Sequence, residues 1–220
     1  TNTATIGYDS HPVQFGGDFE NEVLSYFFPG NIDDPAIYGR ALSAAEIASL
    51  ASADTVNQTA GTTNLGAGGI LHGGIEVNGG SLVGAGTVRG DVENVAIVAP
   101  GNSPGIITIN GNYSQTTDGD LNIEIGGTTV GTQYDQLDVN GTVTLDGVLN
   151  VTLINSFVPT IGNTFTIIDN DGTDAVSGML FDGLAEGSTV TVGGSAFTIS
   201  YVGGTGNDVV LTASAPVTTG

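Results

Sequence analysis

Basic residues are almost absent from this chain of 220 residues. Lysine does not occur, and Arg40 and Arg89 stand against 23 aspartates and glutamates, which gives a formal net charge of −21. Nucleic-acid binding needs clustered Lys or Arg side chains for the phosphates, and docking on anionic lipid needs a polybasic patch. Both classes of partner are therefore excluded. An acidic chain of this kind suits surroundings rich in salt or calcium, where cations screen the self-repulsion.

Cysteine and long apolar runs are also missing. The chain contains no cysteine, so it does not depend on a disulfide, which fits an exported bacterial protein and equally fits many cytosolic ones. No apolar run approaches the roughly 18 residues that a membrane-spanning helix needs, and no signal peptide is present. We therefore expect no membrane insertion, and we expect a mature product or an excised segment.

Glycine and alternating aliphatic residues are plentiful. The 36 glycines and 39% hydrophobic residues indicate a folded, turn-rich β protein. Between Gly105 and Leu153, short runs carry an aliphatic residue at every second position, which gives a strand one apolar and one polar face. We predict that these runs share one core, made of Leu137, Val139, Val143, Leu145, Leu149, Val151 and Leu153.

Tight turns separate these runs. They are predicted to use glycine for its tolerance of positive φ, at Asn110-Gly111, Asp118-Gly119, Asn140-Gly141 and Asp146-Gly147. The Asn-Gly pairs at 78, 110 and 140 are spaced by 32 and 30 residues, which is typical of the coils of a solenoid. The fold class predicted for residues 65–213 is therefore an all-β solenoid.

Four segments carry a family resemblance in this region. They are Gly80–Val92, Ala99–Gly105, Tyr134–Gly141 and Val202–Leu211. Together they resemble the β-helical passenger repeats of bacterial autotransporters and related surface proteins. The resemblance implies a right-handed parallel β-helix, or one that gives way to a β-sandwich near Phe157, displayed outside the cell.

Residues 1–50 differ in texture from the rest. Ser43-Ala-Ala-Glu46 is a capping box that predicts a short helix over 44–51. The stretch Phe28–Ile47 resembles the closing segment of LamG-like, concanavalin-type jelly rolls, which implies a partial jelly roll without its ligand face. Residues 51–64 are small, polar and aperiodic, so we expect a linker there, and residues 214–220 are expected to form a tail.

No convincing catalytic set is present, and we expect no enzyme. Gly101-Asn-Ser-Pro-Gly105 matches a nucleophile-elbow string, but Pro104 has no N–H for an oxyanion and Ile106–Ile109 reads as a strand, so a turn is predicted. His11 and His72 are the only imidazoles and have no partner set.

An acidic run near the start of the chain fits catalysis no better. Asp18, Glu20 and Glu22 would share one face of a strand, as glycosidase carboxylates do, but their spacing does not match the glucanase pattern. A solvated acidic edge is the favoured interpretation.

Calcium is the cofactor that the sequence favours. Asp169, Asp171 and Asp174 place oxygen ligands around Gly172, and the run Gly203–Leu211, which contains Asp208, fits one copy of a calcium-binding repeat. We predict a calcium site at these four carboxylates. The alternative is a loop stabilised by Asx turns.

These features predict an extracellular structural protein, secreted or at the cell surface. We expect a self-assembling filament or surface-layer component, hence a homo-oligomer or polymer, in which a neighbouring copy completes the partial jelly roll. The alternative functions are a carbohydrate-binding adhesin, whose partners would be glycans, and a passenger segment of a larger surface protein.

Overall fold

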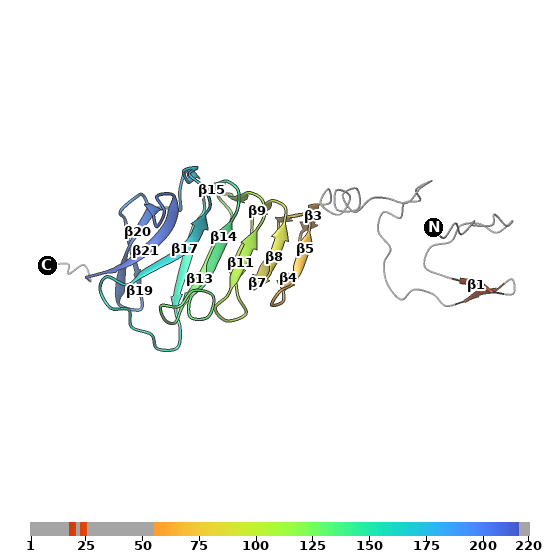
Figure 1. The fold of residues 1–220 in the computed structure, drawn as a ribbon, viewed down its shortest axis with the longest axis horizontal. Helices are drawn as coiled ribbons and strands as arrows, with labels where there is room; N and C mark the ends of the chain where they lie inside the picture. Colours follow the sequence, from red (N-terminus) through yellow and green to blue (C-terminus); the bar gives the residue numbers. More distant parts are fainter. Residues whose placement is uncertain (1–17, 21–22, 26–54, 216–220) are drawn as a thin grey trace, which may run out of the picture. The chain divides into compact units, whose positions relative to one another are not determined.

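The computed structural model describes residues 18–20, 23–25 and 55–215 (Figure 1). The chain divides into two compact units, residues 1–44 and 45–220. In the first unit, β1 (Asp18–Glu20) and β2 (Val23–Ser25) form an antiparallel hairpin. The helix predicted over 44–51 and the jelly-roll strands predicted in residues 1–50, apart from this hairpin, lie outside the described residues. No helix long and apolar enough to span a membrane occurs in the part of the chain that the structure describes.

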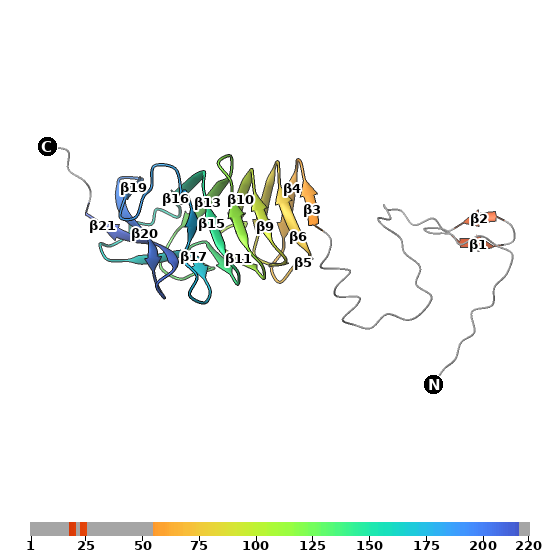
Figure 2. The same ribbon diagram turned by 90° about the horizontal axis from the view of Figure 1, so that it is seen from above.

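From Thr55 onward the chain winds into a parallel β-helix, which confirms the predicted fold class (Figures 1 and 2). Each coil contributes one strand to each of three sheets. The five-stranded sheet contains β4 (Thr62–Leu65), β7 (Ser81–Gly84), β10 (Ile97–Pro100), β13 (Asp120–Ile125) and β16 (Val148–Leu153). The six-stranded sheet contains β3 (Thr55–Gln58), β6 (Gly74–Val77), β9 (Val92–Asn94), β12 (Tyr113–Gln115), β15 (Val143–Leu145) and β18 (Ser177–Gly178).

The third sheet has eight strands and changes character at β17. Its parallel part contains β5 (Ile70–His72), β8 (Thr87–Arg89), β11 (Ile106–Ile109), β14 (Gln136–Val139) and β17 (Thr164–Asn170). Beyond β17 it continues with antiparallel strands, in the order β21 (Asp208–Ser214), β20 (Ser195–Gly203) and β19 (Thr189–Val192). Parallel pairing therefore continues beyond Phe157, where the sequence predicted a change, as far as β18, and the antiparallel strands extend an existing sheet.

The strands begin earlier than the sequence indicates. The expectation of a linker over 51–64 is wrong from Thr55 on, because β3 and β4 pair in parallel with β6 and β7. Their inward positions include the polar residues Gln58 and Thr63, so the alternation of apolar and polar residues that marks later strands is weak here. Gln58 is buried in place of an apolar residue, and its side-chain amide donates to the carbonyls of Gly79 and Ser81, at 3.0 and 3.2 Å.

Coil length is not constant. Stacked Thr62 and Ser81 are 19 residues apart, whereas stacked Asn110 and Asn140 are 30 residues apart. The longer coil contains an excursion, residues 126–135, between β13 and β14. The predicted repeat is therefore right for Asn110 and Asn140, which stack on each other. It is wrong for Asn78, which follows a strand of another sheet and donates to the side chain of Asn57 instead.

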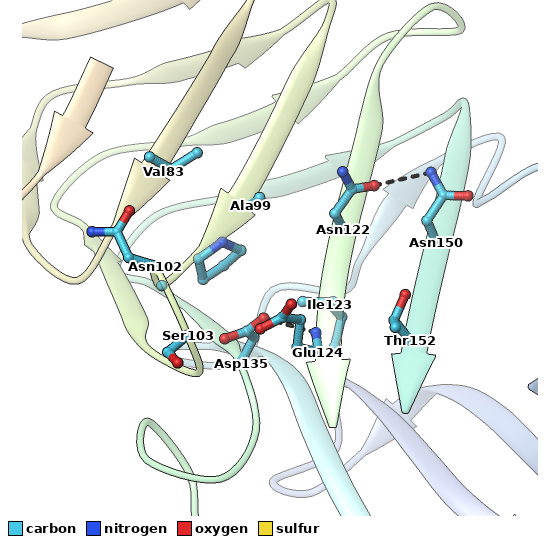
Figure 3. Close-up of a pocket in the computed structure, with 12 residues that line it drawn as sticks. Val83, Ala99, Asn102, Ser103, Asn122, Ile123, Glu124, Asp135, Asn150 and Thr152 are labelled. Atoms are coloured by element: carbon cyan, nitrogen blue, oxygen red, sulfur yellow. Dashed lines mark hydrogen bonds between the residues drawn. The ribbon is translucent and has the colours of Figure 1, made fainter. Parts of the chain in front are cut away.

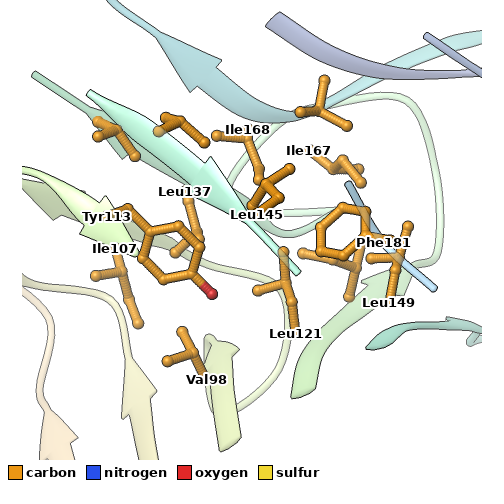
Figure 4. Close-up of a cluster of buried hydrophobic side chains, with 14 of the residues drawn as sticks. Val98, Ile107, Tyr113, Leu121, Leu137, Leu145, Leu149, Ile167, Ile168 and Phe181 are labelled. Carbon is orange, nitrogen blue, oxygen red and sulfur yellow. The ribbon is translucent and has the colours of Figure 1, made fainter. Parts of the chain in front are cut away.

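The core lies inside the coils (Figure 4). Ile75, Val92, Tyr113 and Val143 occupy paired positions in successive coils and are at most 1% exposed. The predicted core is confirmed: its first five members are buried, and Val151 and Leu153 are partly buried against them. At the closing end, Phe165 makes edge-to-face contacts with Tyr134, Phe157 and Phe197.

The four turn glycines were predicted to have positive φ, and three of them do not. Of the four turn glycines, Gly147 has positive φ. At Gly111 and Gly141 a Cβ would lie 2.5 Å from backbone atoms of the preceding coil, at Gly90 and Gly111 respectively. Glycine is needed there because successive coils approach each other closely, and not because of the backbone conformation.

Candidate functional site

A pocket of about 480 Å³ with a mixed polar and apolar lining lies on the outer side of the five-stranded sheet (Figure 3). The corner after β10 and the strands β13 and β16 form its sides. Its lining residues are Val83, Ala99, Pro100, Gly101, Asn102, Ser103, Asn122, Ile123, Glu124, Asp135, Asn150 and Thr152.

Two stacked asparagines form one side of this pocket. Asn122 and Asn150 point outward from paired positions of β13 and β16, and the Asn150 Nδ2 donates to the Asn122 Oδ1 at 3.0 Å. This bond leaves one amide nitrogen and one amide oxygen available to a ligand. The sequence reasoning missed this pair, although both residues follow a core leucine in their runs, at Leu121 and Leu149.

Asp135 lies at the base of the pocket and is 1% exposed. Its Oδ1 accepts from the Gly105 amide at 2.8 Å and its Oδ2 from the Glu124 amide at 2.7 Å. Burial raises the pKa of Asp135 to about 7, although these two bonds act to lower it. Because both oxygens are engaged, Asp135 ties the excursion to β13 and to the corner before β11.

The nucleophile-elbow string forms part of the pocket rim. Ser103 is exposed there, and Ile106–Ile109 forms the strand β11 as predicted. His72 lies exposed on β5, paired in the ladder with Arg89. Asp18 and Glu20 lie on β1, while His11 and Glu22 fall outside the described residues.

Comparison of the chain with models of known protein families, with curated proteins and with solved structures found no match. The resemblances to LamG-like jelly rolls and to autotransporter repeats stay predictions. The function must therefore be argued from the geometry of the chain itself.

The four carboxylates predicted to bind calcium lie near one another in the chain fold but do not converge. Within the described ranges, no three His, Cys, Asp or Glu side chains are placed to hold a metal ion between them. Asp169 and Asp171 are exposed, while Asp208 is 2% exposed. Although Asp169 as a whole is exposed, its carboxyl group is partly shielded from water. This partial burial, together with the charges of Asp208 and Asp138, raises the pKa of Asp169.

The side chain of Asp208 stabilises the hairpin between β20 and β21 through hydrogen bonds. Its Oδ1 accepts from the Asn170 amide at 3.0 Å, and its Oδ2 accepts from the Thr205 amide at 2.7 Å and from the Thr205 hydroxyl at 3.2 Å. Both oxygens are thus engaged by protein donors, and Asp208 fixes its hairpin to the end of β17. Asn170 and Asn207, which the sequence reasoning did not single out, connect this hairpin to the loop 171–176.

Proposed function

We propose that this chain is a structural segment of an extracellular protein, a stiff spacer that assembles head to tail into a filament or surface layer. The observation that carries the proposal is that β4 and β16 end the five-stranded sheet, each hydrogen-bonded to one neighbour among the described strands. Free strand edges of this kind are templates for pairing with another chain.

The two edges suit each other. Both strands run in the same direction within one parallel sheet, so β4 of one copy placed beside β16 of the next would continue that sheet. Such a contact joins two different surfaces and propagates along the axis. The eight-stranded sheet cannot continue in the same way, because β21 already occupies the side of β17 that faces the next coil.

The hydrogen-bonding groups available at these edges follow from the existing bonds. The amides of Val148 and Ile154 donate to carbonyls on the β13 side, at 2.9 and 3.0 Å. Because strand amides alternate in direction, the Val151 amide faces the free edge. On β4, the carbonyls of Gly61 and Leu65 accept from the β7 side, so the Thr62 amide faces the free edge.

Proline substitutions test this pairing. Val151→Pro and Thr62→Pro each remove one amide that faces the free edge, and proline is tolerated on edge strands. Sedimentation velocity across protein concentration should show assembly of the wild-type chain and of the control Thr152→Ser, and monomers for both proline variants with unchanged circular dichroism. A wild-type chain that stays monomeric at low and high salt, or a proline variant that assembles like the wild type, contradicts the proposal.

Glycan binding is the second candidate function, favoured by the pocket. Asparagine, serine and threonine side chains suit sugar hydroxyl groups, and Val83, Ala99 and Pro100 supply a small apolar surface for a ring face. Calorimetric titration with soluble glucan and N-acetylglucosamine oligomers tests it. Binding should be lost in Asn122→Ala/Asn150→Ala and kept in Asn57→Ala, which lies on another sheet; absence of binding to every probe contradicts this function.

A further inference from the structure

An asparagine occupies a core position at the last parallel coil. In the eight-stranded sheet, Val88, Ile109, Val139 and Asn170 are paired in successive coils. The three aliphatic residues are 0% exposed and Asn170 is 1% exposed. Burying an amide where the other coils bury a methyl group is unfavourable unless the polar atoms are bound.

Only one half of the Asn170 amide has a protein partner. Its Nδ2 donates to the carbonyls of Asp174 and Asn207, at 2.9 and 3.4 Å. Its Oδ1 is buried without a partner, and so is the Oδ2 of Asp174. Among the described residues these are the two buried side-chain oxygen or nitrogen atoms that lack one.

The neighbouring side-chain amide of Asn207 is already committed. The Nδ2 of Asn207 donates to the carbonyls of Asp171 and Asp174, both at 3.1 Å. The oxygens of Asp208 accept and do not donate. Lysine is absent from the chain, and Arg89 lies three coils away on β8. The loop 170–174 is thus rich in oxygen acceptors and short of donors, which is the composition of a site for a hard cation.

We propose that the loop 170–174 binds a calcium ion through the Oδ1 of Asn170 and the Oδ2 of Asp174. Main-chain carbonyls of the loop and water complete the six to eight oxygen ligands that calcium takes. Asp208 is a structural residue here and not a ligand. The site would fix the turn between β17 and β18 onto the hairpin of β20 and β21, and it is independent of the proposed assembly.

Calcium-dependent stability tests the site. The unfolding temperature of the full chain should rise more with calcium chloride than with magnesium chloride at equal ionic strength, since magnesium demands a tighter octahedral shell. Titration calorimetry should give one site per chain. Asp174→Asn, which keeps the side-chain shape, should weaken calcium binding at least about tenfold, and the exposed Asp118→Asn should not.

Two results overturn the proposal. If calcium and magnesium raise the unfolding temperature equally in the wild type and in Asp174→Asn, the effect is charge screening alone. If calcium has no effect, water satisfies the two oxygens. Asp208→Asn adds a separate check: it should lower the unfolding temperature without calcium, yet its remaining folded fraction should still bind one ion.

Discussion

At the residue scale, single glycines allow successive coils to approach each other closely. Gly141 lies against the backbone of Gly111, with no room for a methyl group. We expect Gly141→Ala to lower the free energy of unfolding by about 1–3 kcal/mol, as overpacking does. Gly66→Ala is the control, because nothing lies within 4 Å of its Cβ position. Urea unfolding measures both, and an equal effect of the two substitutions would contradict the stacking argument.

Asp135 predicts a pH dependence. Its folded-state pKa, about 7, lies above the ordinary 3.8, so the folded chain binds a proton that the unfolded chain has lost. The stabilisation is complete below pH 3.8 and is lost as the pH rises through 7, by on the order of a few kcal/mol. Asp135→Asn should flatten the decline in unfolding free energy between these values, whereas the exposed Asp118→Asn should not. An unchanged slope in Asp135→Asn would show that other groups cause the decline.

At the element scale, a buried side-chain amide lies at the same corner in three of the first four coils, at Gln58, Asn94 and Gln115, while the second coil has Val77 there. The Nε2 of Gln115 donates to the carbonyls of Gly119, Asp146 and Val148, at 2.9, 2.8 and 3.1 Å. In the preceding coil, the Nδ2 of Asn94 donates to the carbonyl of Asp120 at 3.0 Å. These side chains bring donors to carbonyls at the corner between two sheets, where the Gly119 carbonyl also accepts from the Val148 amide at 2.9 Å.

Removing one such amide should therefore cost more than its size suggests. In the next coil the equivalent position is Leu145, so Gln115→Leu fits sterically. We expect it to lower the unfolding free energy by about 2–3 kcal/mol, because three carbonyls each lose the hydrogen bond from the Gln115 amide. Ser114→Leu, on the outward face of the same strand, should change it by less than about 1 kcal/mol. Equal losses in denaturant unfolding would contradict the role of the amide.

Sequence reasoning succeeds where side chains alternate and fails where backbone contacts decide. The runs at Leu121–Ile125 and Leu149–Leu153 were recognisable because apolar side chains face one core. Strands β3 and β4 do not show this pattern, since polar residues, Gln58 and Thr63, take inward positions that are aliphatic in the next coil. Asn170 looks like any loop asparagine in the sequence, and only the pairing with Val139 reveals its core position.

The pocket could not be predicted for a similar reason. Asn122 and Asn150 become neighbours only when the strand pairing is known, and Asp135 meets Gly105 across 30 residues of chain. Spacing within the sequence does not specify which corner each turn occupies. The unequal coils, with the excursion over 126–135, hide that correspondence.

Charge dominates the behaviour expected of the whole molecule. The formal net charge is −21, and the ladders place Glu76 beside Glu93 and Asp138 beside Asp169. Like charges at paired positions are destabilising, and salt screens them. The unfolding temperature should rise with sodium chloride and then level off. An unfolding temperature that does not change with salt would mean that repulsion between the carboxylates does not destabilise the fold.

The unequal coils also determine how the β-helix would respond to mechanical load. Its inter-strand bonds lie along the axis, so a force that pulls Thr55 and Ser214 apart would peel coils from an end one at a time. A coil of 19 residues would release about 65 Å of extended chain, and one of 30 residues about 100 Å. A single molecule stretched to failure would thus record the order of its coils as a series of steps of unequal length.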